Sequence, residues 1–352
     1  MRNKIKIKFQ LIVGALLAFL WAMPFTSSAH ENYVLSHAQI DAGMRDYSLN
    51  VFNALKNPHN LIIGVAFGLG SFILFVLYFL FQHSKWGIRF DKFIKRFDPF
   101  GSVVLRFALG ISFIASAQTH AYLGPEISVY SLPFGGLIHI LLYILGIMLI
   151  IGLFSEVIGA VSLLVFILAT IVYKDYILTY FNYFGEFIAL IFFGSKVFSV
   201  DRLLQGTSSA LGRMREKFKQ YEIAIIRITY GISVLYPAIS IKLLHPIIIV
   251  EIVQQYHLTQ FHWLFPQDPL LIALGTGLAQ VVVGTAIILG FQTRLNTLIT
   301  FVLMAMSVLF FKEAVWPHYI LLALALYLMI NNGGEWGLDS WIQKKWAQKR
   351  IA

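Results

Sequence analysis

The sequence contains no cysteine among its 352 residues. Disulfide bonds, thiolate metal sites and thiol redox chemistry are therefore excluded, and a redox role would need a bound cofactor or quinone. Charged residues are also scarce, at 12%, whereas hydrophobic residues make up 58%. Because a soluble domain is roughly half apolar and about a quarter charged, this composition predicts that most of the chain lies in lipid.

Motifs for nucleotide and acyl chemistry are missing as well. The sequence has no Gly-x4-Gly-Lys-Ser/Thr, no Gly-x-Gly-x-x-Gly and no Gly-x-Ser-x-Gly, which argues against an ATP-driven pump. The net charge of +10 comes from basic residues in short blocks between apolar runs. Such blocks indicate membrane topology rather than a nucleic-acid partner.

The first 29 residues have the order of a secretory signal peptide. Four basic side chains precede the apolar run 11–23, and small residues end the segment at 27–29. This order predicts a mature chain that begins at His30. The alternative is an uncleaved signal anchor, for which the apolar run is short.

Nine long apolar runs follow, each reaching or approaching the length that a helix needs to cross about 30 Å of hydrocarbon. They predict an all-α integral membrane protein with nine transmembrane helices after signal cleavage. The runs are 61–81, 103–121, 134–153, 157–173, 183–197, 223–241, 270–290, 295–311 and 319–330.

The basic residues indicate how these spans are oriented. If residue 30 lies outside, all but five of the basic residues fall on the cytoplasmic side or in the signal segment, as the positive-inside rule requires. This predicts a multi-pass protein of a bacterial-type inner membrane, with a periplasmic or extracellular mature N-terminus and a cytoplasmic C-terminus. The five on the other side are Arg45, Lys56, Lys174, Lys242 and Lys312.

The chain also resembles itself. A shift of 138 residues aligns glycines and charged residues without a gap, and the segment from Arg106 to Gly110 matches the one from Arg227 to Gly231 at a shift of 121. A unit of four helices present twice has the same orientation in both copies, so the repeats are predicted to be parallel. The pairs at 138 are Gly146 and Gly284, Gly152 and Gly290, Glu156 and Arg294, Lys174 and Lys312, Asp175 and Glu313, and Asp201 and Asp339.

These features divide the chain into eight predicted segments. They are a signal peptide (1–29), a periplasmic N-terminal segment (30–60), an extra transmembrane helix (61–82), a basic cytoplasmic loop (83–100), repeat one (101–205), a basic cytoplasmic linker (206–222), repeat two (223–341) and a basic cytoplasmic tail (342–352).

Three motifs resemble those of DoxX-like membrane proteins, over roughly residues 100–340. They are the Arg-x-x-x-Gly opening of each copy, the Gly-x5-Gly-x3-Arg stretch 284–294, and the Gly-x4-Ser-x-Asp-Arg ending at 194–202. Some DoxX and DoxD relatives are membrane subunits linked to thiosulfate-to-quinone electron transfer or to oxidative-stress complexes. The resemblance therefore implies a quinone cofactor and a redox partner protein. Where relatives often carry a glutamate in the second helix, this chain has Leu142 and Gln280, which puts proton-coupled chemistry there in doubt.

The histidines suggest a different function. Eight of ten lie on the predicted outer side, and imidazole is a common ligand for copper and zinc. Cleavage before His30 would offer an amine and an imidazole to one metal ion, with His37 and His59 as further ligands. The alternative is that polar residues of any kind collect in outer loops. The eight are His30, His37, His59, His120, His245, His257, His262 and His318.

Several polar residues in or beside the spans are predicted to face the bundle interior, because an uncompensated polar group in hydrocarbon is costly. A periplasm-facing pocket is expected, with the groups of the two copies forming either one central site or two, although bonding between neighbouring helices would also explain these residues. The candidates are Gln118, His120, His139 and Glu186 in the first copy, and Lys242, His245, Gln280 and His318 in the second. No catalytic residue is predicted.

Three arginines, Arg106, Arg227 and Arg294, lie at predicted cytoplasmic helix ends, where snorkelling to lipid phosphates would explain each. The sequence thus favours a DoxX-like membrane subunit of a quinone-linked or redox-stress system. The alternatives are a transporter or a copper- or zinc-handling protein that uses outer histidines, and a purely structural or assembly role.

Overall fold

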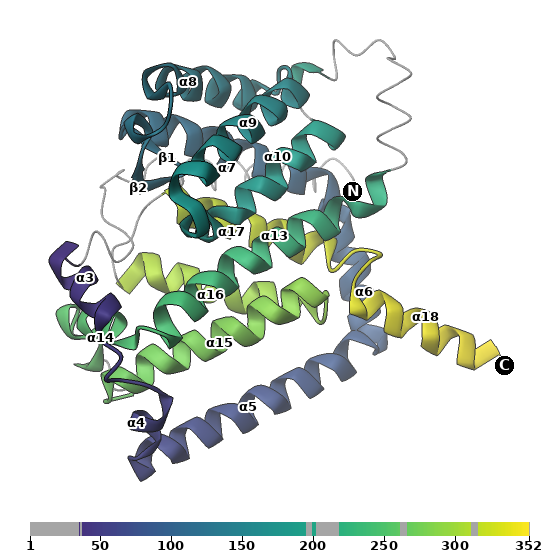
Figure 1. Ribbon diagram of the computed structural model, residues 1–352. Helices are drawn as coiled ribbons and strands as arrows, with labels where there is room; N and C mark the ends of the chain where they lie inside the picture. The colour runs from purple at the N-terminus through teal and green to yellow at the C-terminus, as the bar shows by residue number, and fades with distance from the viewer. Residues whose placement is uncertain are drawn as a thin grey trace.

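The computed structural model describes residues 35, 37–194, 199–201, 218–260, 266–310 and 316–351. The predicted signal peptide, His30 and His262 lie outside these residues. The described chain is a helical bundle (Figure 1) with one short antiparallel ribbon, β1 (Ala121–Tyr122) and β2 (Gly124–Ser128), which the all-α prediction did not include. The ribbon follows the first long helix of the bundle.

The helices fall into two sets, one on either side of the segment 202–217. The first set is α3 (His37–Arg45), α4 (Val51–Leu55), α5 (Pro58–Gln82), α6 (Lys85–Ile94), α7 (Asp98–Gln118), α8 (Gly135–Ile151), α9 (Ser155–Tyr173) and α10 (Phe181–Phe193). The second is α13 (Glu222–Pro237), α14 (Pro246–Gln255), α15 (Pro269–Leu289), α16 (Thr293–Phe310), α17 (Trp316–Asn331) and α18 (Leu338–Ile351).

Each of the nine predicted spans overlaps one of these helices. Among the described residues, five helical runs are long and apolar enough to cross a membrane: 58–82, 85–118, 155–192, 219–243 and 269–289. The run 155–192 holds both α9 and α10, which pack against each other because the backbone reverses near Lys174, at a φ of +51°. The helices α8, α16 and α17 are apolar but shorter, so the number nine stays a prediction.

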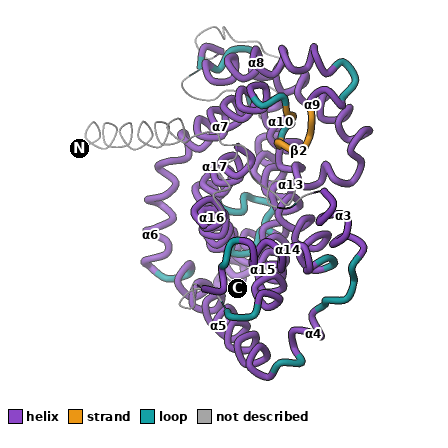
Figure 2. The backbone as a smooth tube through the Cα atoms, turned by 90° about the vertical axis from the view of Figure 1, so that its left-hand side faces the viewer, coloured by secondary structure: helices purple, strands orange, loops and turns teal. Residues whose placement is uncertain are grey.

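Helix α5 lies outside the bundle. Figures 1 and 2 place it at one edge of the molecule, far from α8, and its apolar side chains are mostly exposed. Polar contacts hold it at two points. Near its start, the Asn60 amide donates to the carboxylate of Asp268, and near its middle the Gln292 amide donates to the Phe75 carbonyl oxygen at 2.8 Å. An apolar surface without a protein neighbour is what a lipid-facing helix requires.

The two sets of helices share one core. Within the sets, α7 packs on α8 and α13 packs on α15; between them, α7 packs on α17 and α10 packs on α13. Figure 2 shows α7, α13 and α17 in the middle of the molecule. The largest cluster of buried apolar side chains accordingly draws on both halves.

Two glycine pairs set the closest helix contacts. A Cβ on Gly146 of α8 would lie 2.8 Å from the carbonyl oxygen of Gly110 in α7. A Cβ on Gly231 of α13 would lie 3.0 Å from the carbonyl oxygen of Gly284 in α15. Small residues of this kind let helix backbones approach each other in a membrane. The same contact therefore occurs in both halves, at positions that the sequence shifts of 121 and 138 pair.

We expect Gly146→Ala to destabilise the protein by about 1–3 kcal/mol, because the new methyl group overlaps backbone atoms of α7. Gly136→Ala, in the same helix, is the matched control, since a Cβ there meets nothing within 4 Å. Thermal unfolding of the purified protein in detergent measures both. If the two variants unfold at the same temperature, the close contact of α7 with α8 does not contribute to stability.

Candidate functional site

Two buried arginines lie at one end of the bundle. Arg227 is 2% exposed, and its Nη1 donates to the carbonyl oxygens of Ile287, at 2.8 Å, and of Ile288, while its Nη2 donates to that of Trp336 at 3.3 Å. Carbonyl groups at a helix C-terminus carry partial negative charge and stabilise a cation. Snorkelling of this arginine to lipid is therefore wrong: the side chain binds the end of α15.

In the first half Arg106, which is 4% exposed, has the matching place: a Cβ on Gly152 would lie 2.8 Å from its Nη1, and one on Gly290 would lie 2.7 Å from Arg227 Nη1. Helix α8 ends at Gly152 with a φ of +69°, and the Gly152 carbonyl oxygen accepts a hydrogen bond from the Asp201 amide at 2.9 Å. The Asp201 carboxylate accepts from the backbone amides of Phe154, at 2.6 Å, and Ser155, at 2.9 Å. A carboxylate at a helix N-terminus satisfies amides that lack a helical partner.

The second half has a similar arrangement. Helix α15 ends at Gly290 with a φ of +68°, and its carbonyl oxygen accepts from the Asp339 amide at 3.1 Å. The Asp339 carboxylate faces the backbone amides of Gln292 and Thr293 at the start of α16. Burial raises the pKa of Asp339, and these amides oppose that effect. Two similar helix-end structures therefore lie at this end of the bundle, one in each half.

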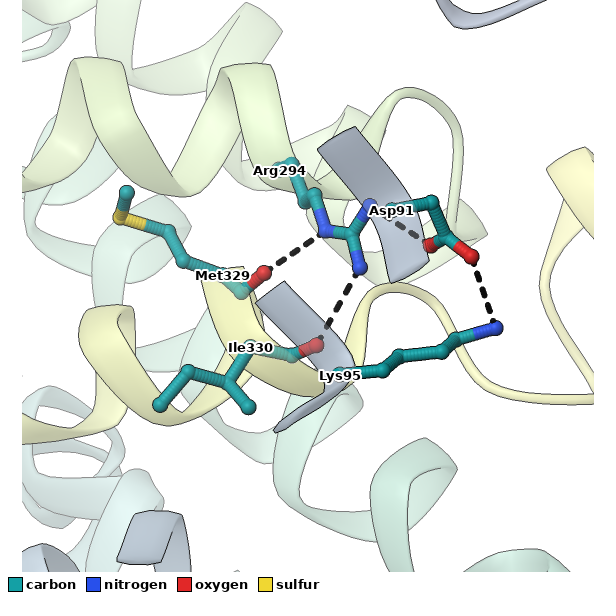
Figure 3. Close-up of polar contacts among 5 residues, drawn as sticks. All are labelled: Asp91, Lys95, Arg294, Met329 and Ile330. Carbon is teal, nitrogen blue, oxygen red and sulfur yellow. Dashed lines mark hydrogen bonds and ion pairs between the residues drawn. The ribbon is translucent and has the colours of Figure 1, made fainter. Parts of the chain in front are cut away.

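The third arginine, Arg294, joins three helices (Figure 3). Its Nη1 lies 2.7 Å from the Asp91 carboxylate of α6, its Nε donates to the Met329 carbonyl oxygen at 2.8 Å, and its Nη2 donates to that of Ile330 at 3.3 Å. Lys95 lies 3.0 Å from the other oxygen of Asp91. Snorkelling is wrong here too. The predicted basic loop 83–100 contains α6, which this ion pair holds against the bundle.

At the opposite end, the first predicted pocket does not form as one group. The rings of His120 and His139 lie 4.9 Å apart, and His139 Nε2 lies 2.9 Å from the carbonyl oxygen of Ala117. Gln118 is exposed, contrary to the expectation that it faces the interior, because it is the last residue of α7. Glu186 is buried on α10, which packs against α13, and does not join the histidines.

The second predicted group is closer together. Lys242, Gln280 and His318 line one cavity of about 190 Å³. Gln280 and His318 are buried, and Lys242 is half-buried. His245 is also buried, but it lies against the ring of Tyr47, at 4.9 Å between ring centres, and is not part of the cavity wall.

Lys242 is held in place by a local irregularity at the end of α13. Pro237 ends α13, and the chain continues as a π-helical turn, η5 (Ala238–Leu243). Gly277 of α15 lies beneath this turn, since a Cβ there would be 3.0 Å from the Lys242 Cβ. Proline removes a helical hydrogen bond, and π-helical turns are frequent at functional sites. The proline was the sequence signal for this turn.

We call the cavity lined by Lys242, Gln280 and His318 the outer cavity. The other residues of its wall were not predicted. Asn182 from α10, Ser233 from α13 and Ser307 from α16 supply polar groups, and residues such as Leu303 and Leu321 supply apolar surface. Asn182 and Glu186 are four residues apart on one helix, a spacing that places both on the same face. That spacing could have identified the pair.

The predicted metal ligands do not form a site within the described residues, which contain no group of three His, Asp or Glu side chains suited to a metal ion. His59 is exposed near the start of α5. His37 begins α3, and His30 lies outside the described part. The structure therefore leaves the metal site of these three histidines a prediction.

Comparison with known families finds a match in the second half of the chain. Residues 223–313 match the family model for DoxX. This segment is similar to DoxX. The match starts in α13, runs through α14, α15 and α16, and includes Lys242 and Gln280 of the outer cavity. No match was found among curated proteins or among solved structures.

We expect Arg294→Met to destabilise the protein by about 3 kcal/mol, because it leaves Asp91 without its buried partner and two carbonyl groups without a donor. The matched control is Lys95→Met. Lys95 contacts the same carboxylate, but its side chain is 61% exposed, so its loss should cost less than about 1 kcal/mol. Unfolding midpoints in detergent compare the two. Equal losses would show that the exposed pair matters as much as the buried one.

Proposed function

We propose that the protein is a membrane subunit of a quinone-linked redox system, and that the outer cavity of its DoxX domain holds the quinone. One observation carries the proposal: an apolar cavity of about 190 Å³ into which Lys242, Gln280 and His318 converge. Apolar walls with a few polar groups are the usual composition of small-molecule sites. The Gln280 amide is 7% exposed, and its oxygen has no partner among the described residues, as expected of a group that awaits a ligand.

The residues fit this ligand class. The Lys242 ammonium and the Gln280 amide would each donate a hydrogen bond to a quinone carbonyl oxygen, and the apolar residues of the wall would contact the ring and tail. When bound, a quinone accepts electrons together with protons. His318 would offer a ring nitrogen as a further hydrogen-bond partner for the same ligand. The electrons would come from a redox partner protein, because this chain has no thiol.

We also infer that residues 101–205 and 223–341 are parallel tandem copies. The support is the recurrence of the glycine contact, of the left-handed glycine that ends the second helix, and of the aspartate that follows the fourth. Duplicated halves of one orientation are related by an axis along the membrane normal. The outer cavity then lies within the second copy and is completed by α10 of the first.

The distribution of charge supports a periplasm-facing cavity. Figure 1 shows α6 and α18 at one end of the bundle and α3 and α14 at the other. Arg106, Arg227 and Arg294 lie at the first end, and the outer cavity has α14 in its wall. By the positive-inside rule the end with α6 and α18 is cytoplasmic. This supports an inner-membrane protein with a cytoplasmic C-terminus.

We expect the purified protein to bind a short-chain quinone such as decylubiquinone, and Gln280→Leu and Lys242→Met each to weaken binding about tenfold, the effect of losing one hydrogen bond of about 1.4 kcal/mol. Lys56→Met is the control, because Lys56 is exposed at the end of α4. Titration calorimetry in detergent gives the Kd values. Absence of binding by the unmodified protein, or equal binding by all four proteins, would overturn the proposal.

The competing function is metal handling or transport at the outer face. The adjacent rings of His120 and His139 favour it, because they offer two imidazoles at that end. If it is right, native mass spectrometry should find a chain that starts at His30 and carries copper or zinc, and His30→Ala should release the metal. A different N-terminus without metal contradicts this function. Variants of the cavity that alter stability alone would instead indicate a structural role.

A further inference from the structure

A buried glutamate lies where the two halves meet. Glu186 is 3% exposed on α10, beside Gly185, which is so close to Thr229 of α13 that a side chain would not fit. The Asn182 amide donates to Glu186 Oε1 at 3.2 Å, whereas Oε2 is buried without a hydrogen-bond partner in the described chain. Ionisable residues within membrane spans are costly, and they commonly belong to ion or proton paths.

On one side, this glutamate is connected to the outer cavity. Asn182, its hydrogen-bond partner, lines that cavity together with Ser233, Gln280 and His318. Asn182 and Glu186 lie one turn apart on α10. The amide therefore lies between the contents of the outer cavity and the carboxylate.

On the other side, Glu186 lines a second cavity of about 40 Å³, which we call the inner cavity. The titratable groups that share its wall are Arg106 from α7, Glu222 from α13 and Tyr327 from α17. One water needs roughly 10–15 Å³ of such space, so the inner cavity has room for about three waters. It is too small for a cation with its hydration shell, and the positive charge of Arg106 opposes a second cation.

The inner cavity borders a third one at the basic end of the bundle. Glu222 and Tyr327, whose hydroxyl donates to Glu222 Oε1 at 3.1 Å, also line a cavity of about 950 Å³. Asp98 and Asp339 belong to the wall of this larger space. Polar groups thus follow one another from the outer cavity to the opposite end, along the contact between the two halves.

We propose that these groups form a proton relay, with Glu186 as its central carrier. The Glu186 carboxylate takes a proton from a hydronium ion that reaches it from the outer cavity past the Asn182 side chain, which does not itself carry the proton; an O–H bond forms at Glu186 as one breaks in the hydronium ion. Glu186 releases that proton to water in the inner cavity, and Glu222 passes it to water in the third cavity. Glu186 returns to its carboxylate form, and nothing is oxidised or reduced. The reverse sequence moves a proton outward.

This inference goes beyond the proposed quinone site and does not depend on it. A quinone in the outer cavity would sit at one end of the relay, but any ligand that gains or loses protons there would use the same path. The relay can therefore be tested by measuring proton movement alone, without quinone.

The test is proton flux in liposomes that contain the full-length protein, no quinone and a trapped pH-sensitive dye, driven by a potassium diffusion potential with valinomycin. We expect flux well above that of protein-free liposomes. Glu186→Gln keeps the shape of the side chain but cannot carry a proton, so flux should fall about 100-fold. Glu222→Gln should also reduce it. Glu251→Gln is the matched control, since Glu251 lies on α14 outside all three cavities and should leave flux unchanged.

Stability is tested separately from transfer. Glu186→Asp restores a carboxyl group at the same position and should recover part of the flux, which a merely structural role for Glu186 would not explain. If Glu186→Gln fails to fold, the infrared carboxyl signal of the unmodified protein still reports whether a buried glutamic acid changes protonation when the imposed pH changes. Flux equal to that of protein-free liposomes, full flux in Glu186→Gln, or an invariant carboxyl signal would each overturn the relay.

Discussion

The close approach of the first and second helices of each half, at Gly110 with Gly146 and at Gly231 with Gly284, is the constraint on which the rest of the structure depends. An arginine lies four residues before the first glycine of each pair, so the short distance between helices brings its guanidinium to the last carbonyl groups of the neighbouring helix, as Arg227 does with α15. Side chains larger than glycine would separate the helices and leave the arginine without these acceptors. A buried charge without partners is costly, so the glycines and the arginines depend on each other.

The helices and the recurring glycine spacing could be predicted from the sequence, because apolar runs and glycine spacings are local features. Which helices pack against one another could not be predicted from the sequence. In a soluble protein, an apolar side chain is expected to lie in the core. In a membrane protein, the side chains that face lipid are apolar as well, so hydrophobicity does not tell which side of a helix packs against protein. Helix α5 and helix α7 read alike in sequence, yet the side chains of α5 are largely exposed and those of α7 largely buried. For the same reason Arg227, predicted to reach lipid phosphates, instead binds carbonyl groups inside the bundle.

The candidate site was predictable only in part. Lys242, Gln280 and His318 come together because three separate elements meet there; the sequence marked Gln280 as a polar residue inside a span and the other two as polar residues beside one. Asn182 was missed because it belongs to the other half, and the sequence did not show whether the two halves share one site. Gln118 was assigned to a pocket because it closes an apolar run, although the end of a helix is where a polar side chain reaches water most easily. The positions of these side chains depend on packing between segments that are far apart in the sequence, which a single sequence does not reveal.

The two ends of the bundle differ in how closely the two halves resemble each other. At the basic end, both halves place a left-handed glycine beside an arginine and an aspartate, where the last carbonyl groups of α8 and α15 need donors. At the outer end, the halves differ: the first has the ribbon β1–β2, and the second has the π-helical turn and α14. A cavity opens where that second arrangement faces α10. Glu186 lies on α10 between this cavity and the basic end. The chemistry we propose therefore uses the difference between the halves at one end of the bundle and their similar packing at the other.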